Sequence, residues 1–103
     1  MSYTFLKIPV SQIPNQRFRV VLNGQNCIIS VYKRAGNIFM DLTCNTNTVF
    51  NGNICIVGEL INQYKSIYFD GILFFIDKLG NTSIPDYTQF NDRFVLMYGY
   101  SPS

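Results

Sequence analysis

The alternation of apolar and charged residues in the segment RFRVVL, residues 17–22, constrains the fold of this chain more than any other feature. Side chains at every second position lie on one face of an extended strand, so Phe18, Val20 and Leu22 share one face and Arg17 and Arg19 take the other. The Asn23-Gly24 pair that follows accepts the positive φ angles of a tight turn. The apolar segment 27–34 then runs back, and the two runs predict an antiparallel hairpin.

Turns continue to divide the chain after this hairpin. A second turn at Ala35-Gly36-Asn37 leads into the alternating segment 38–43, which completes a predicted three-stranded meander. Residues 44–53 are rich in asparagine, threonine and glycine and predict a loop or a short strand between turns. Residues 54–58 predict another short strand, and residues 59–69, which fit no single period, are interpreted as mostly extended.

The last third of the chain carries the most apolar run. The segment GILFFID, 71–77, is short and rich in β-branched and aromatic residues, which predicts a strand buried on both faces. Residues 93–100 predict the final strand. Residues 4–10 predict a short strand at a sheet edge, because Pro9 has no amide hydrogen to donate. The expected fold is one all-β domain, 1–103, of about seven or eight short antiparallel strands in a sandwich or a partly open barrel.

The composition narrows the functions open to such a domain. Only 14% of the 103 residues are charged and 48% are hydrophobic, so exposed apolar surface and association with other proteins are expected. The net charge is +2 and the basic residues are dispersed, which gives no electrostatic footprint for nucleic acid. The longest apolar run, 72–76, is too short to span a membrane, and Met1-Ser2-Tyr3-Thr4 lacks the pattern of a signal peptide, so a cytoplasmic origin is expected.

Residues suited to catalysis are sparse. The chain has no histidine, and each carboxylate adjoins a turn or a polar strand face, where a solvated or turn-capping role is expected. A small hydrolase that uses Asp70 and Asp77 as a carboxylate pair stays open as an alternative. Cys27, Cys44 and Cys55 are widely spaced and form no C-x-x-C motif, so free buried thiols and no zinc site are expected. The scattered glycines match no phosphate-binding loop, and no cofactor is expected.

The aromatic residues keep a second alternative open. Phenylalanine and tyrosine interleaved on a sheet suit a β-barrel module that binds single-stranded nucleic acid or oligosaccharide. A place in the core is the more economical interpretation, because each buried ring stabilises a small fold by about 2–3 kcal/mol. The rings interpreted in this way are Phe18, Tyr32, Phe39, Phe74, Phe75, Phe94 and Tyr98.

Four ordered segments of the chain resemble the small baseplate plug proteins of contractile-tailed bacteriophages. They are IPNQRFRVVLNGQNCIISVYKR, MDL, FDGILFFID and PDYTQFNDRFVLMY, and the span from the first to the last takes in most of the chain. One position departs from the family pattern, since Phe90-Asn91 stands where members often carry Leu-Gly, although asparagine also accepts the left-handed conformation. The residues at the family-motif positions are Pro14, Gly24, Gly71, Asp77, Pro85, Asp86, Tyr87, Arg93, Phe94, Leu96 and Tyr98.

The resemblance implies a structural protein of the virion, without enzymatic activity, that is made in the host bacterial cytoplasm and located in the tail baseplate. Such a protein is expected to close the lumen of the tail tube or hub until genome ejection. Its expected partners are the hub, the end of the tail tube and the spike region, with several copies in a ring. Neither a membrane nor sequence-specific nucleic acid is an expected partner.

The resemblance also gives roles to the closing segment. Pro85-Asp86-Tyr87 is expected to set the last turn. Arg93 is expected to pair with a turn carboxylate such as Asp86 or with backbone carbonyls. The apolar motif residues Phe94, Leu96 and Tyr98 are expected to pack the final strand into the core.

Overall fold

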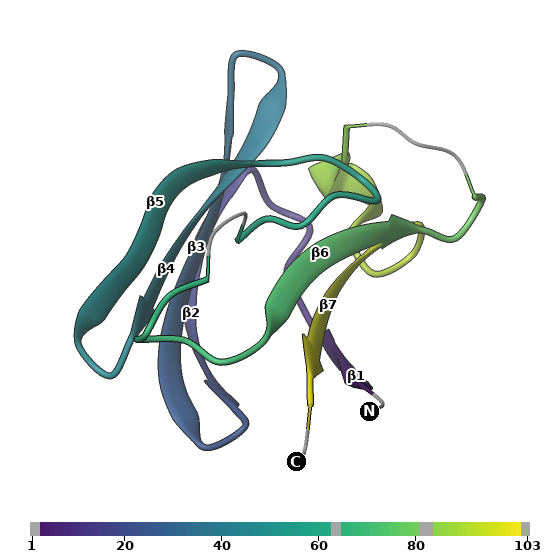
Figure 1. The fold of residues 1–103 in the computed structure, drawn as a ribbon. Helices are drawn as coiled ribbons and strands as arrows, with labels where there is room; N and C mark the ends of the chain where they lie inside the picture. Colours follow the sequence, from purple (N-terminus) through teal and green to yellow (C-terminus); the bar gives the residue numbers. More distant parts are fainter. Residues whose placement is uncertain (1–2, 63–64, 81–83, 102–103) are drawn as a thin grey trace.

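The computed structural model describes residues 3–62, 65–80 and 84–101 and shows seven strands in two antiparallel sheets (Figure 1). The sheets pack face to face and do not close into a barrel, which confirms the predicted all-β sandwich class. The strands are β1 (Thr4–Ile8), β2 (Asn15–Leu22), β3 (Gln25–Arg34), β4 (Asn37–Cys44), β5 (Asn47–Cys55), β6 (Ile72–Asp77) and β7 (Phe94–Tyr100). One 3-10 helix, η1 (Tyr87–Gln89), precedes β7.

The four-stranded sheet is a meander in the order β2-β3-β4-β5. The predicted first hairpin is present, with Leu22 opposite Gln25 and a turn at Asn23-Gly24 in which both residues have positive φ. The second turn is formed by Ala35 and Gly36, also at positive φ. Local turn chemistry therefore favours the two hairpins that join β2, β3 and β4, as the sequence predicts.

The three-stranded sheet joins the two ends of the chain. Its order is β1-β7-β6, so the last strand lies in the middle and pairs antiparallel with the first strand and with β6. In Figure 1, β1 and β7 lie side by side on the opposite side of the molecule from β2. The edge position of β1 confirms the expectation from Pro9, which follows the last residue of the strand.

The core fills the space between the sheets and takes alternate residues from β3, β4 and β6 and most of β7, while β1, β2 and β5 each contribute one buried residue at their ends. Side chains that are completely buried include Ile29 and Met40 from the four-stranded sheet and Phe75, Leu96 and Tyr98 from the three-stranded sheet. In β3, β4 and β6 the buried residues alternate with exposed or half-buried ones, as a sandwich requires.

The asparagine-rich segment 44–53 differs from its expected form. Most of it belongs to β5, a nine-residue strand that ends at Cys55 and absorbs part of the strand expected at 54–58. Two register shifts beside Leu42 and a positive φ at Gly52 let this segment pair with β4 despite its polar composition. Turn residues within a bulged strand resemble a loop when they are judged from composition alone.

The prediction that 71–77 is buried on both faces is wrong. In β6 only Leu73, Phe75 and Asp77 are buried, and the alternate residues are partly exposed. β7, the central strand of the three-stranded sheet, is more completely buried, and only Met97 and Tyr100 in it are partly exposed. The described part of 59–69 contains turns and isolated bridges and no strand, so the extended interpretation is also wrong there; residues 63–64 lie outside the described part.

Candidate interaction surface

The Pro85-Asp86-Tyr87 step forms a capped turn, as expected. Pro85 is buried, and the Asp86 carboxylate accepts hydrogen bonds from the Thr88 backbone N–H at 3.0 Å and from the Thr88 hydroxyl at 2.8 Å. These bonds begin η1 and hold the pKa of Asp86 below its usual value. Lys33 Nζ lies 5.7 Å from the centre of the Tyr87 ring, which connects the turn to the end of β3.

Arg93 pairs with a carboxylate, as expected, but that carboxylate is Asp77, at the turn after β6, and not Asp86. Arg93 Nε donates to Asp77 Oδ1 at 3.0 Å and Nη2 donates to Oδ2 at 2.9 Å. The Asp77 side chain is completely buried and its Oδ1 also accepts from the Leu79 backbone N–H at 2.9 Å. Asp77 ends β6 opposite Phe94, the first residue of β7, so the register of the sheet brings it beside Arg93. The carboxylate raises the pKa of Arg93.

The apolar motif residues of β7 lie in the core. Phe94, Leu96 and Tyr98 are all buried, as the sequence predicts. The Tyr98 hydroxyl donates to the Asp70 backbone carbonyl at 2.5 Å and accepts from Gln25 Nε2 at 3.4 Å. Burial raises the pKa of Tyr98 to about 12. Tyr98 thus connects the three-stranded sheet to the first hairpin of the other sheet.

The remaining motif residues lie apart from each other. The Pro14 carbonyl accepts from the Lys33 backbone N–H at 2.9 Å, and Gly24 occupies the first hairpin turn. Gly71 has a φ of 125°, and a Cβ there would overlap the Tyr98 ring. The motif residues therefore support turns and strand contacts at several places, and they do not gather into one site. That the motif residues also contact other baseplate proteins stays a prediction.

Phe90-Asn91 keeps the left-handed turn that a Leu-Gly pair suggests. Asn91 has a φ of 70°, and its side chain pairs with the backbone of Val10 by accepting from the N–H at 3.3 Å and donating to the carbonyl oxygen. Phe90 is completely buried and stacks on Phe75, with ring centres 5.5 Å apart. The substitution therefore retains the turn and adds a connection to the segment between β1 and β2.

The carboxylates form no catalytic pair in the described part of the chain. Asp70 precedes β6 and Asp77 ends it, so more than about 16 Å of strand separates them. Asp41 accepts from the Tyr32 hydroxyl at 2.9 Å and from the Gly52 N–H at 2.6 Å. Among the described residues, no three histidine, cysteine or acidic side chains gather as a metal site would require. The hydrolase alternative thus lacks a site in this part of the chain.

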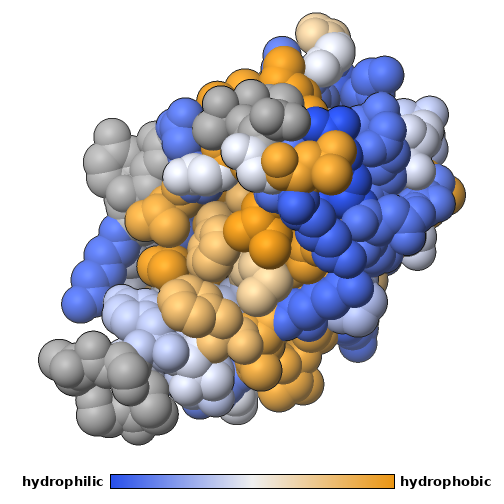
Figure 2. Space-filling view, turned by 90° about the vertical axis from the view of Figure 1, so that its right-hand side faces the viewer, coloured by the Kyte–Doolittle hydropathy of each residue, from blue (hydrophilic) through white to orange (hydrophobic). Residues whose placement is uncertain are grey.

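The outer side of the three-stranded sheet is a surface that the motif residues do not explain. Directly opposite residues in the register share a face, and this face is built from eight strand positions, one of which is charged and one of which is glycine. Figure 2 shows that apolar side chains gather here into a continuous patch. We call this patch the outer apolar face; its residues are Phe5, Lys7, Ile72, Phe74, Ile76, Val95, Met97 and Gly99.

Aromatic rings cover the middle of the outer apolar face. The Phe5 ring is 51% exposed and meets the Phe74 ring edge-on, with centres 5.9 Å apart. Tyr3 stacks on the other side of Phe5 at 6.1 Å. A Cβ at Gly99 would come within 2.7 Å of the Phe5 ring and 3.1 Å of Ile72, so glycine lets both side chains lie flat on the sheet. The face is therefore shaped by packing and is not a set of isolated exposed residues.

The outer apolar face adjoins an edge strand. Residues 58–62 cover the edge of β6 that does not pair with β7. The Gly58 and Ile61 N–H groups there donate to the Phe75 and Leu73 carbonyls. β1 pairs with β7 on one side, and no described strand pairs with its other side. An edge of this kind can accept a strand from another chain.

The composition predicts exposed apolar surface, but the sequence did not locate it on the outer apolar face. Three of the rings interpreted as core, Tyr32, Phe39 and Phe74, lie on outer faces, so that interpretation is wrong for them. The odd-numbered and the even-numbered positions of 72–76 are all apolar, a pattern that predicts burial on both faces of the strand. An edge strand with one exposed apolar face gives the same sequence pattern.

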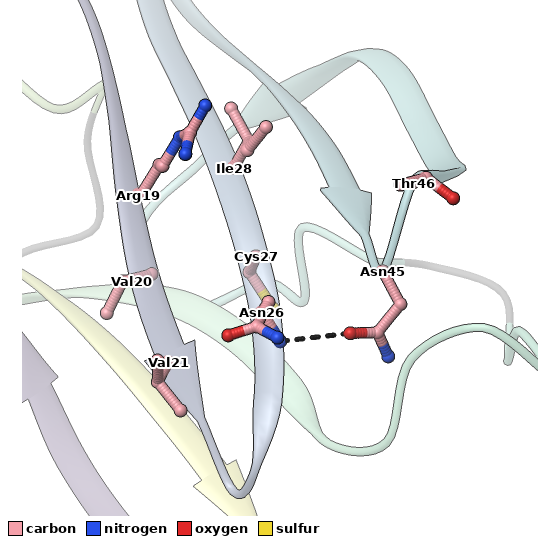
Figure 3. A pocket seen from close by; sticks show the side chains of 8 residues that line it. All are labelled: Arg19, Val20, Val21, Asn26, Cys27, Ile28, Asn45 and Thr46. Atoms are coloured by element: carbon pink, nitrogen blue, oxygen red, sulfur yellow. Dashed lines mark hydrogen bonds between the residues drawn. The ribbon is translucent and has the colours of Figure 1, made fainter.

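A second surface feature is a hollow of about 540 Å³ beside the first hairpin, lined by β2, β3 and the turn after β4 (Figure 3). Arg19 and Ile28 lie opposite each other on neighbouring strands of this hollow, and the Asn26 N–H donates to Asn45 Oδ1 at 3.2 Å at its floor. Cys27 also lines it. Arg19 is the single charged residue in the lining, so the hollow lacks an acid–base pair.

Comparison with known proteins identifies the family. In the described part of the chain, no helix is long and apolar enough to cross a membrane. A comparison with curated proteins found no match. Residues 5–101 match the family described as "Cyanophage baseplate Pam3 plug gp18", which is nearly the whole chain and confirms the resemblance to phage baseplate plugs. This chain therefore belongs to that family of cyanophage baseplate plug proteins and is a structural component of a phage tail baseplate.

Proposed function

We propose that this protein closes the lumen of the tail tube or hub until genome ejection, and that it is held there through the outer apolar face. Membership of a baseplate plug family supports the role. The observation that supports the surface is the apolar sheet face around Phe5 and Phe74, which the chain's own residues leave partly exposed. In a domain of this size, a partly exposed apolar face is most readily covered by a neighbouring protein.

The chemistry of the outer apolar face favours a protein partner. Of its eight strand positions only Lys7 is charged, whereas a nucleic acid site needs several cations for the phosphates. An oligosaccharide site needs convergent hydrogen-bonding groups beside its rings. Tyr32 and Phe39 on the other sheet are stacked on each other at 6.0 Å, with Arg34 over Tyr32, so these rings are already engaged. The occupant we infer is the apolar surface of a neighbouring baseplate protein.

The proposal includes the arrangement of the assembly. Several copies in a ring would contact the hub, the end of the tail tube and the spike region, and the free edge of β1 would add backbone pairing to the apolar contact. A plug of this type works by occupying space and needs no catalytic group or cofactor. It is made in the host cytoplasm and acts in the virion.

The test is co-assembly of charged variants with the adjacent baseplate proteins. Phe5→Asp and Phe74→Asp place a carboxylate on the outer apolar face, and each is expected to weaken capture of the neighbouring proteins at least about tenfold. Ile67→Asp is the matched control, because Ile67 is 92% exposed and lies in a loop outside that face. Circular dichroism shows whether each variant is folded. A folded Phe5→Asp variant that co-assembles like the wild type would overturn the proposed surface.

A further inference from the structure

Cys27 and Cys44 lie directly opposite each other on β3 and β4. Their Sγ atoms are 2.9 Å apart, and both side chains are buried. Opposite residues on antiparallel strands have Cα atoms about 4.5–5.5 Å apart, which falls within the range that a disulfide spans. The backbone therefore already holds the two thiols where a disulfide requires them.

We propose that Cys27 and Cys44 are a redox site that closes into a disulfide between β3 and β4. The third thiol, Cys55, takes no part: it lies opposite Ile38, and six residues of β4, or about 20 Å, separate Ile38 from Cys44. The chain thus carries one reactive pair and one buried thiol that serves as an internal control.

The two thiols differ in their surroundings. The Cys44 thiol forms a hydrogen bond to Cys27, and this bond lowers the pKa of Cys27 and raises the pKa of Cys44. Cys27 also lines the hollow beside the first hairpin, whereas Cys44 is not among its lining residues (Figure 3). Cys27 is therefore the thiol that attacks first, and Cys44 is the thiol that resolves the reaction.

The pair lies at an end of the sheet, which gives an oxidant access. β3 begins two residues before Cys27 and β4 ends at Cys44, so opening of a short end exposes both thiols without unfolding the core. The hollow of about 540 Å³ on the side of Cys27 has room for a small disulfide compound such as oxidised glutathione.

The reaction is thiol–disulfide exchange with such a compound. The Cys27 thiolate attacks one sulfur of oxidised glutathione, a mixed disulfide forms and one glutathione thiolate leaves. The deprotonated Cys44 then attacks the Cys27 sulfur, the Cys27–Cys44 bond forms and the second glutathione leaves. Two electrons pass from the cysteines to glutathione disulfide, and the two thiol protons pass to solvent or to the released glutathione.

The disulfide would stabilise the protein after the virion has left the host cell. A cytoplasm keeps thiols reduced, whereas the medium around a free virion is oxidising. The pair would then be open during synthesis and closed in the particle, a step that rests on the proposed function. The closed loop of about 18 residues restricts the unfolded chain and raises the stability of the four-stranded sheet. The chemistry itself is tested on the purified protein and does not depend on the location.

The experiment treats the purified full chain with oxidised glutathione, then unfolds it, alkylates the remaining thiols and measures its mass. The expected result is a loss of two hydrogen atoms, one alkylated cysteine that peptide mapping places at Cys55, and a thermal midpoint that rises by several degrees and falls again with reductant. Three alkylated cysteines after this treatment, or a disulfide that includes Cys55, would overturn the proposal.

Two variants separate the steps. Cys44→Ser removes the resolving thiol, so a mixed disulfide with one glutathione is expected to accumulate at Cys27. Cys55→Ser is the matched control and is expected to form the Cys27–Cys44 disulfide as the wild type does, which keeps the test valid where Cys44→Ser does not fold. A stable mixed disulfide in Cys55→Ser would contradict the role of Cys44.

Discussion

Arg93 and Asp77 form a two-pronged ion pair that closes the end of the three-stranded sheet where β6 meets β7. The carboxylate is completely buried, while the guanidinium is partly exposed and lies over the Phe94 ring, 4.8 Å from its centre. A bidentate arrangement needs the planar fork of arginine. The arginine of the closing segment thus stabilises the end of β6, and the preceding turn is capped separately by Asp86.

Arg93→Lys and Asp77→Asn test this pair. Lysine retains the charge but cannot make two parallel bonds, so Arg93→Lys is expected to lower the urea midpoint. Asp77→Asn removes two charge-assisted bonds and is expected to destabilise the fold by on the order of 2 kcal/mol. The double variant is expected to lose less than the sum of the two, because both changes break one interaction. Additive losses would show that the pair contributes nothing as a unit. Arg17→Lys, at an exposed strand position, is the control.

Asn91 combines a left-handed backbone with a side chain that pairs with Val10. Asn91→Ala loses the side-chain bonds and keeps a Cβ at a φ of 70°, so a loss of about 2–3 kcal/mol is expected. Asn91→Gly loses the same bonds but removes the backbone penalty, and a loss of about 1 kcal/mol is expected. Chemical denaturation measures both. Equal losses in the two variants would show that the left-handed conformation contributes little.

Gly71 and Gly24 both have positive φ, but they differ in the space around them. A Cβ at Gly71 would overlap the Tyr98 ring and lie 2.8 Å from the Gly99 carbonyl oxygen, whereas no atom lies within 4 Å of a Cβ at Gly24. Gly24→Ala is therefore expected to lower the free energy of unfolding by about 1 kcal/mol through the backbone alone. Gly71→Ala must also displace a buried ring, and a loss of about 3 kcal/mol or more is expected. Thermal denaturation that ranks the two variants in the opposite order would contradict this account.

The parts of the fold that the sequence predicts well are those fixed by local chemistry. The first hairpin depends on Asn23-Gly24 and on alternation in both flanking strands, so its register follows from neighbouring residues. The edge position of β1 follows from Pro9 in the same way. The pairing of β1 with β7 joins residues almost a hundred positions apart, and no local pattern specifies it.

Local sequence patterns predict neither the partner of Arg93 nor the outer apolar face, and the reason is the same for both. Asp77 becomes the neighbour of Arg93 because β6 pairs with β7, which the sequence does not reveal. Phe74 is apolar whether a strand is buried on both faces or has one face open to a partner. Sequence pattern shows that a side chain avoids water, and strand order decides whether the chain itself or another protein covers it.

Tyr98 makes the stability of the fold depend on pH in the alkaline range. Burial raises the pKa of its phenol to about 12, from about 10 in an unfolded chain, so the folded state holds the proton more tightly. Its contribution is therefore complete below pH of about 10 and is lost as the pH rises through about 12, with a slope of up to about 1.4 kcal/mol per pH unit.

The variant Tyr98→Phe isolates this effect from the titration of the cysteines. It is expected to be less stable than the wild type by about 1 kcal/mol near neutral pH, because the hydrogen bond to the Asp70 carbonyl is lost. The wild type should then lose this advantage between pH of about 10 and about 12 and become less stable than Tyr98→Phe, because a pKa shift of about two units corresponds to about 2.7 kcal/mol, more than the hydrogen bond contributes. Urea denaturation at a series of pH values measures the difference, and Tyr68→Phe, which removes an exposed phenol, is the matched control. A difference between wild type and Tyr98→Phe that stays constant across this range would show that the phenol of Tyr98 titrates as it does in the unfolded chain.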